Sequence, residues 1–117
     1  MFALTPQHRF YFYTLPCDMR KSFFTLSGLV RDTMGKDPEN GDVYIFINRQ
    51  CTSMKLLHMK NGGFVIYHKK LNSGYFKLPG FDPMSHSFSM TYNDLAMLVD
   101  GFTAENLTTK KDGFLLR

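Results

Sequence analysis

The apolar positions of the first third of the chain predict a strand followed by a helix. Aromatic residues concentrate in residues 8–13 and Pro16 follows them, which is typical of a short strand. After Asp18, apolar residues recur at intervals of three and four, which predicts a helix with one buried stripe: Met19, Phe23, Leu26, Val30 and Met34. Gly35 is placed to end this helix, and residues 37–41 have the composition of a turn.

Four short strands are predicted next, at residues 43–48, 53–59, 64–70 and 75–78. Residues 61–63 (Asn-Gly-Gly) and 72–74 (Asn-Ser-Gly) tolerate positive φ, which tight hairpin turns require. The first of the four strands is apolar on both faces, so we expect it at the centre of the sheet. The pattern indicates an antiparallel meander that ends in an irregular connection at residues 79–87.

A second helix is predicted at residues 92–100. Thr91 and Asp94 have the spacing of a capping box, and Gly101 is placed to end the helix. The order of strand, helix, four-strand meander and helix predicts an α+β fold, with an antiparallel sheet of about five strands and both helices packed on one face. We expect one domain over residues 1–102 and a tail over residues 103–117. In the tail, Lys110 and Lys111 suggest a flexible basic arm, whereas the apolar residues 114–116 suggest a segment covered by a partner chain.

Composition and charge narrow the class of protein. The chain has 117 residues, a formal net charge of +4 and a pI near 9.1, which favours an acidic partner without requiring one. Cys17 and Cys51 belong to no zinc-binding spacing, so we expect free thiols in a reducing compartment. No apolar run is long enough to span a bilayer and no secretion signal is evident, so we expect a cytoplasmic protein.

Charge is unevenly distributed along the predicted sheet. No acidic residue lies between Asp42 and Asp82, where lysines, arginine and histidines alternate with aromatic residues. Such a surface suits a polyanion, because fixed positive charge attracts phosphates and aromatic faces can stack on bases. An equally good interpretation is a lysine-covered outer face that keeps edge strands from aggregating.

A search for catalytic groups is mostly negative. The chain has no Gly-rich phosphate loop, no zinc-protease motif, no nucleophile elbow and no paired carboxylates for a metal. Cys51 and His58 form a weak nucleophile–base candidate, and a buried thiol with a surface imidazole is the preferred interpretation. His58 and His68 flank the first hairpin at similar distances, so we expect surface neighbours rather than a metal pair. The sequence argues against an enzyme, and we expect no metal and no cofactor.

Arg20 and Lys21 fall in the first turn of the first predicted helix. Cations are unfavourable there because of the helix dipole, so their presence suggests a bound phosphate or carboxylate. Alternatively, Asp18 simply neutralises the two cations. Helical spacing also places Arg20, Phe24 and Arg31 on a common flank.

Several short motifs resemble one family in order and spacing. Residues 16–23 (Pro-Cys-Asp-Met-Arg-Lys-Ser-Phe), followed by Gly28-Leu29-Val30, resemble a segment of the TnpB-type accessory proteins of the sixty-six family of bacterial insertion sequences. Further similar segments are residues 37–41, 43–49, 54–57, 61–64, 67–71, 74–79 and 95–101. The resemblance covers residues 11–102. It implies a small accessory protein of a mobile element, which works alongside a large transposase that carries the catalytic acids.

The sequence departs from this family pattern at three places. Asn48-Arg49 is followed by Gln50-Cys51-Thr52-Ser53, where relatives commonly have a run of arginines. Leu78 replaces a tryptophan before Pro79, and Ser22 replaces a glycine. If the arginine run contacts DNA, this protein has lost much of that contact.

Two modes of action follow for a non-catalytic accessory factor. The first is binding to element-end DNA through seven basic residues: Arg20, Lys21, Arg31, Arg49, Lys55, Lys69 and Lys70. The alternative is a protein–protein adaptor without direct DNA contact, which docks on the large transposase or the other accessory protein through Tyr67, Tyr75 and Phe76. We expect no membrane partner, and an unpaired edge strand would offer a route to a homo-oligomer.

Overall fold

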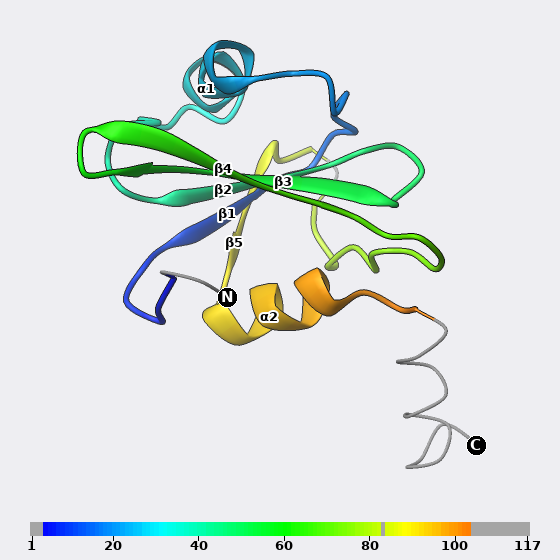
Figure 1. Ribbon diagram of the computed structural model, residues 1–117. Coiled ribbons are helices and arrows are strands. Elements are labelled where there is room, and N and C mark those ends of the chain that lie inside the picture. Colours follow the sequence, from blue (N-terminus) through cyan, green and yellow to red (C-terminus); the bar gives the residue numbers. More distant parts are fainter. Residues whose placement is uncertain (1–3, 83, 104–117) are drawn as a thin grey trace.

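A five-stranded sheet lies between two helices in the part of the chain that the computed structural model describes, residues 4–82 and 84–103 (Figure 1). The order of strands across the sheet is β4-β3-β2-β1-β5. Along the chain, the elements are β1 Phe10–Tyr13, α1 Phe23–Asp32, β2 Val43–Ile47, β3 Ser53–Lys60, β4 Gly63–Lys70, β5 Ser87–Met90 and α2 Tyr92–Asp100. The α+β class is as expected.

One pair of neighbouring strands is parallel. β1 pairs with β2 in parallel, with Phe10 beside Val43, and the other pairs in the sheet are antiparallel. A parallel pair needs a crossover connection, and α1 provides it. The expectation of a wholly antiparallel sheet was therefore wrong, because the first helix returns the chain to the starting end of β1.

The two helices cover opposite faces of the sheet (Figure 1). On the α1 face, Tyr44, Phe46 and Leu57 share a core cluster with Leu26 and Val30 of the helix. On the α2 face, a second cluster joins residues of β1, β2 and β3 to Leu95, Leu98 and Val99. The expectation that both helices share one face was wrong. All five residues of β2 are buried, so this central strand needs cover on both sides.

The fifth strand is not where the sequence placed it. Only Tyr75 of residues 75–78 pairs as a strand does, in an isolated bridge to Phe102, and residues 72–74 form no hairpin. Instead β5 pairs with β1, from Phe10 beside Met90 to Tyr13 beside Ser87. Phe76 is 1% exposed and belongs to the α2-face core, which explains why its segment looks apolar without being a strand.

The first helix begins later than expected, and the second matches its prediction. Ser22 is the N-cap of α1, and the backbone N–H of Lys21 donates to the Asp18 carbonyl in a turn before the helix. Arg20 and Lys21 therefore precede α1 rather than occupy its first turn. At α2, the Thr91 hydroxyl accepts from the Asp94 N–H at 3.0 Å, and Asp94 accepts from the Thr91 N–H at 3.2 Å.

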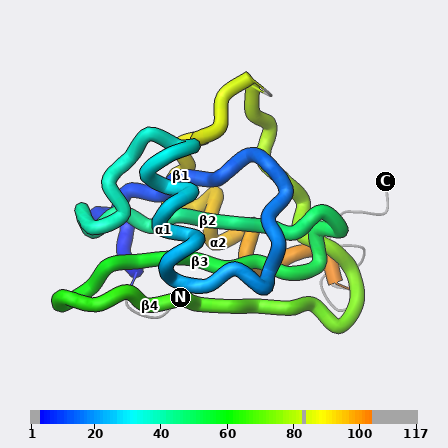
Figure 2. The backbone as a smooth tube through the Cα atoms, turned by 90° about the horizontal axis from the view of Figure 1, so that it is seen from above, coloured from blue at the N-terminus to red at the C-terminus, as the bar shows by residue number. Residues whose placement is uncertain are grey.

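Seen from above, α1 lies across β1, β2 and β3, while the β3–β4 hairpin forms an outer edge (Figure 2). Among the described residues, no helix is both long and apolar enough to cross a bilayer. Lys110, Lys111 and residues 114–116, for which the sequence suggested a basic arm or a covered segment, lie outside the described residues.

Candidate nucleic-acid interface

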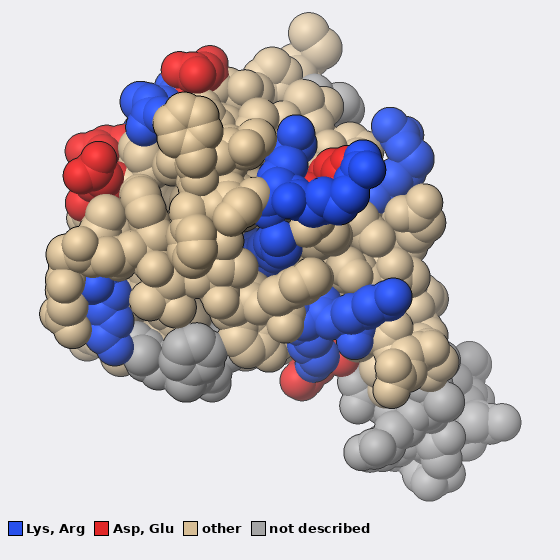
Figure 3. Space-filling view, turned by 45° about the horizontal axis from the view of Figure 1, so that its top comes forward, with Lys and Arg blue, Asp and Glu red and all other residues tan. Residues whose placement is uncertain are grey.

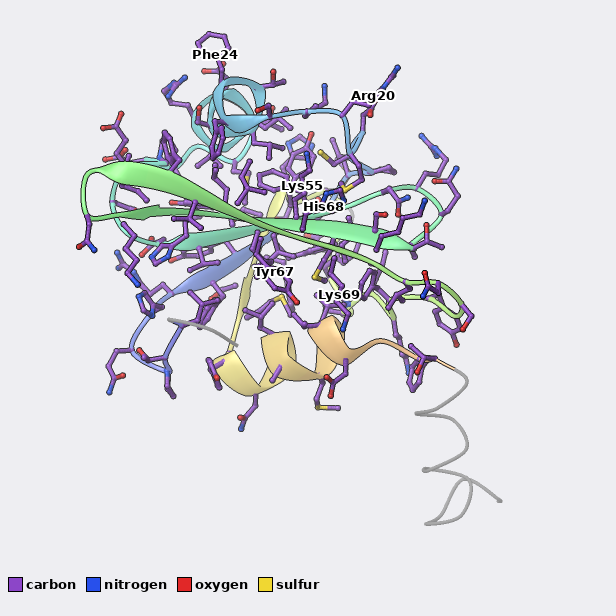
Figure 4. All side chains as sticks on the ribbon, viewed as in Figure 1. Arg20, Phe24, Lys55, Tyr67, His68 and Lys69 are labelled. Atoms are coloured by element: carbon purple, nitrogen blue, oxygen red, sulfur yellow. The ribbon has the colours of Figure 1, made fainter. Side chains whose placement is uncertain are left out.

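The register of the β3–β4 hairpin divides the candidate cations between the two faces of the sheet. Lys55 pairs with His68 and Ser53 pairs with Lys70, so these lysines lie on the α1 face. Lys69 pairs with Met54 of the α2-face core, and therefore points the other way. Figure 4 shows this division, with Lys55 and His68 toward α1 and Lys69 toward α2.

Two of the candidate lysines use their ammonium groups in hydrogen bonds within the protein. Lys55 is only 9% exposed, and its Nζ donates to the Lys21 carbonyl at 2.6 Å. Lys69 Nζ donates to the Val99 carbonyl at 2.8 Å, in the last turn of α2, where the helix dipole favours a cation. Lys55 thus holds the segment before α1 against the sheet, and Lys69 caps a helix.

Arg20 is exposed and paired with Asp18. Its Nε lies 3.1 Å from Oδ1 and its Nη2 lies 2.6 Å from Oδ2 of that carboxylate. Side-chain and backbone hydrogen bonds from Arg20 hold the pKa of Asp18 well below its usual range. The interpretation in which Asp18 neutralises this arginine thus has a geometric basis. Because the pair is solvent-exposed, exchanging the carboxylate for a phosphate costs little.

Arg49 projects from the turn between β2 and β3. Asn48 shapes this turn, since its Oδ1 accepts from the N–H groups of Thr52 and Ser53 at 2.8 and 3.0 Å. The Cys17 N–H donates to the Ile47 carbonyl at 2.9 Å, which brings the segment before α1 alongside. Between the two segments lies a hollow of about 560 Å³, lined by Pro16, Cys17, Asp18, Met19, Arg20, Asn48, Arg49 and Gln50.

We call the exposed and half-buried lysines and arginines around this hollow and at the adjoining end of β4 the cationic surface: Arg20, Lys21, Arg49 and Lys70. Figure 3 shows Lys and Arg side chains gathered on this side of the molecule, with acidic atoms among them. Burial, together with the charges of Lys55 and Lys70, lowers the pKa of His68. Arg31 is exposed in the last turn of α1 and lies apart from this group.

The role of Asn48 was not predicted from the sequence, although the Asn-Arg pair was the available signal. Asn48 carries no charge, yet its amide fixes the turn that presents Arg49. Cys51 in the same turn has a φ of 59°, a left-handed conformation unusual for a residue with a side chain. The Asn48 amide and the left-handed backbone at Cys51 thus shape the turn in which Arg49 is exposed.

The residues considered as a nucleophile–base pair or as metal ligands do not form such a site. His58 is buried on the α2 face, with Nε2 3.1 Å from the Gly41 carbonyl and its ring 5.0 Å from that of His8. His68 lies on the α1 face, so the expectation that these two histidines are surface neighbours was wrong. Cys51 is half-buried, and burial raises the pKa of its thiol. His58 is buried rather than at the surface, so the expectation of a buried thiol with a surface imidazole was wrong. Among the described residues, no group of three or more His, Cys, Asp or Glu could hold a metal ion.

The three candidate partner anchors differ in exposure. Phe76 is a core residue, and Tyr67 is half-buried against the α2-face core. Tyr75 is 49% exposed, with its ring 5.6 Å from that of Phe102. Next to Phe102 lies a groove of about 530 Å³, lined in part by Leu78, Pro79 and Met97. Of the three candidate anchors, Tyr75 is therefore the most exposed.

The fold and this surface define a small α+β protein with basic side chains gathered on one side. The family model described as IS66 Orf2 like protein matches residues 8–109, and the chain belongs to this family. Membership confirms the resemblance found in the sequence and implies an accessory role in the transposition of IS66-type insertion sequences.

The chain is also similar to the uncharacterized protein y4jC of Sinorhizobium fredii (strain NBRC 101917 / NGR234). The two are 28% identical over 89 residues, which is 75% of this chain and 74% of the relative. No solved structure matches the chain significantly.

Proposed function

We propose that this protein assists transposition by binding the DNA of its own element through the cationic surface. The observation that carries the proposal is the convergence of cations from three separate segments. Arg20, which precedes α1 next to Lys21, lines the same hollow as Arg49 of the β2–β3 turn. Lys70 ends β4 and pairs with Ser53, where that turn meets β3. Lys55 and Lys69 are left out of the proposed contact because their ammonium groups are bonded to backbone carbonyls.

The chemistry of these groups fits a phosphate backbone. Arginine and lysine neutralise phosphates and release condensed counterions, which makes binding steeply salt-dependent. Phosphate contacts position a protein on DNA without reading its sequence, so any preference for the element ends rests on Arg49 or on DNA shape. Arg20 contributes by exchanging its Asp18 partner for a phosphate.

The test is a titration of the purified protein against a duplex with the ends of its element and a scrambled duplex, at two salt concentrations. We expect salt-sensitive binding, and a preference for the ends would establish specific recognition. The double variant Arg49→Gln/Lys70→Gln should weaken binding and lower the slope of log affinity against log salt by about 2. Absence of binding at low salt would overturn the proposal.

A protein adaptor is the second candidate, favoured by the groove on the α2 side and the exposed Tyr75 beside it. In this role the protein would dock on the large transposase or on the other accessory protein of the element. Co-purification that survives nuclease treatment, and that Tyr75→Ala abolishes, would support it. Co-purification that nuclease abolishes indicates a DNA bridge instead.

A further inference from the structure

Two aromatic side chains in the first turn of α1 are exposed. Phe24 is 86% exposed and Phe23 is 44% exposed, although the same helix buries Leu26 and Val30 against the sheet. Figure 4 shows Phe24 on the outer side of α1, pointing away from the sheet. The ring of Phe24 thus contributes little to the core, and the helix would pack equally well with a polar residue at this position.

Basic residues precede and follow Phe24 along the chain, and the exposed Phe23 lies next to it. Lys21 lies three residues before it, next to Arg20 of the cationic surface. Arg31 follows seven residues later, almost in line along the helix and about 10 Å away. Gly28 lies between them, and a Cβ there would meet nothing within 4 Å, so the strip is open. Asp32 is displaced by roughly a quarter-turn around the helix axis.

The exposed Phe24 ring and its basic neighbours favour a nucleic acid over a protein as the ligand. A protein partner that buried Phe24 would also have to desolvate the neighbouring lysine and arginines, whereas a nucleic acid supplies phosphates for them. In a duplex both faces of each base are stacked on other bases, so an exposed ring can stack only on an unpaired base. Aromatic rings flanked by cations are the usual platform for single strands.

We propose that Phe24 stacks on an unpaired base while Lys21 and Arg31 hold the flanking phosphates, so that the preferred ligand is single-stranded or locally unpaired DNA. This inference rests on the proposed function and names its substrate class. It extends the binding surface from the hollow near Arg20 along the outer side of α1 to Arg31.

The chain contains no tryptophan, which gives a direct test of stacking. Phe24→Trp introduces one fluorophore at the proposed platform, and titration with an unlabelled single-stranded oligonucleotide should quench it. Met97→Trp is the matched control, because Met97 is also exposed but lies on α2, across the sheet. Its fluorescence should change little at the same occupancy.

Affinity provides the second readout. Phe24→Ala should weaken single-strand binding on the order of tenfold and leave duplex binding within about twofold. Because Phe24 is exposed, Phe24→Ala should have the same urea midpoint of unfolding as the wild type. Measuring that midpoint verifies that the variant is folded.

The outcomes separate this inference from the proposed function. If the wild type binds neither single-stranded nor duplex DNA, the proposed DNA role fails. If the wild type binds both, but Phe24→Ala binds single strands normally and Phe24→Trp is not quenched, stacking is overturned while the DNA role stands. Loss of transposase binding in Phe24→Ala with unchanged single-strand affinity also overturns it, in favour of a protein contact.

Discussion

At the scale of single residues, neighbouring lysines of β4 have different roles because strand side chains alternate between faces. Lys69 points to the α2 face and bonds to the Val99 carbonyl at the end of α2. Lys70 points to the α1 face and is exposed. A pair that looks like one basic motif in the sequence therefore separates into a structural residue and a candidate ligand-binding residue.

Alanine substitutions of the two lysines should affect different properties: stability for Lys69 and DNA binding for Lys70. Lys69→Ala removes a charged hydrogen bond and should lower the free energy of unfolding by about 1 kcal/mol, without weakening DNA binding. Lys70→Ala should leave stability within about 0.5 kcal/mol and weaken DNA binding. Urea unfolding and DNA titration of both variants provide the comparison. Equal loss of affinity in the two variants would contradict the division between faces.

His58 should make stability depend on pH. Burial and the nearby His8 and Lys60 lower its pKa from the ordinary value of 6.5, and they outweigh the opposing effects of the Gly41 carbonyl and Asp42. As the pH falls past 6.5, His58 of the unfolded chain therefore binds a proton, whereas His58 of the folded protein stays neutral until a lower pH. The contribution of His58 to stability is therefore complete above pH 6.5 and is lost as the pH falls through the lowered folded value.

We expect the wild-type free energy of unfolding to decrease between pH 7.5 and pH 5.5, and His58→Gln to flatten that decrease. Urea unfolding at three pH values measures it. His68→Gln is the control, because His68 is exposed on the other face and should affect the slope less. A decrease of the same steepness in wild type and His58→Gln would remove His58 as its source.

At the scale of elements, local signals explain what the sequence predicted well. The apolar run of β2 identified the central strand, the Asn61-Gly62 turn identified the β3–β4 hairpin, and the capping box identified α2 with its bounds. β5 was missed because it has four residues, no β-branched side chain and a partner, β1, far away in the sequence. Its formation depends on an edge that exists only after the rest of the sheet has assembled.

Glycines with the same φ should differ in their tolerance of alanine. Gly62 has a φ of 80° with open space around it, so Gly62→Ala should cost about 1 to 2 kcal/mol for the left-handed backbone alone. Gly74 has a φ of 81°, but a Cβ there would overlap the Phe102 carbonyl oxygen. That carbonyl accepts from the Tyr75 N–H at 3.1 Å, so the bridge must break.

We expect Gly74→Ala to cost roughly 2 kcal/mol or more beyond Gly62→Ala. Urea unfolding of the two variants gives the difference directly, with the hairpin glycine as the matched control for backbone strain. Similar losses would mean that the segment at Phe102 moves aside freely, and that the bridge contributes little to stability.

At the scale of the whole molecule, the fold separates a cationic α1 side from an α2 side that carries a groove. The sequence alone drew attention to Arg20 and Lys21 through their position at the start of a predicted helix, and to Arg49 through the family motif. It could not assign Lys55 and Lys69 to internal bonds, because that assignment depends on strand register and on two distant carbonyls, of Lys21 and Val99. The face of the sheet on which a side chain lies, and the burial of that side chain, are defined only once the sheet has assembled.

The position of charge, rather than its total, should control DNA binding. Lys70→Glu and Lys60→Glu each replace one positive charge by one negative charge, so they change the formal net charge of +4 equally. Lys60 pairs with Gly63 at the opposite end of the hairpin, roughly 23 Å along β4 from Lys70. This separation exceeds twice the Debye length of about 8 Å at physiological salt.

At physiological salt we therefore expect Lys70→Glu to weaken DNA binding on the order of tenfold or more, and Lys60→Glu to change it little. At about 0.01 M salt the Debye length reaches about 30 Å, so the two variants should become more similar. Titrations of both proteins at the two salt concentrations measure this convergence. If the variants lose affinity equally at physiological salt, DNA senses the total charge of the protein, and the cationic surface is not the site of contact.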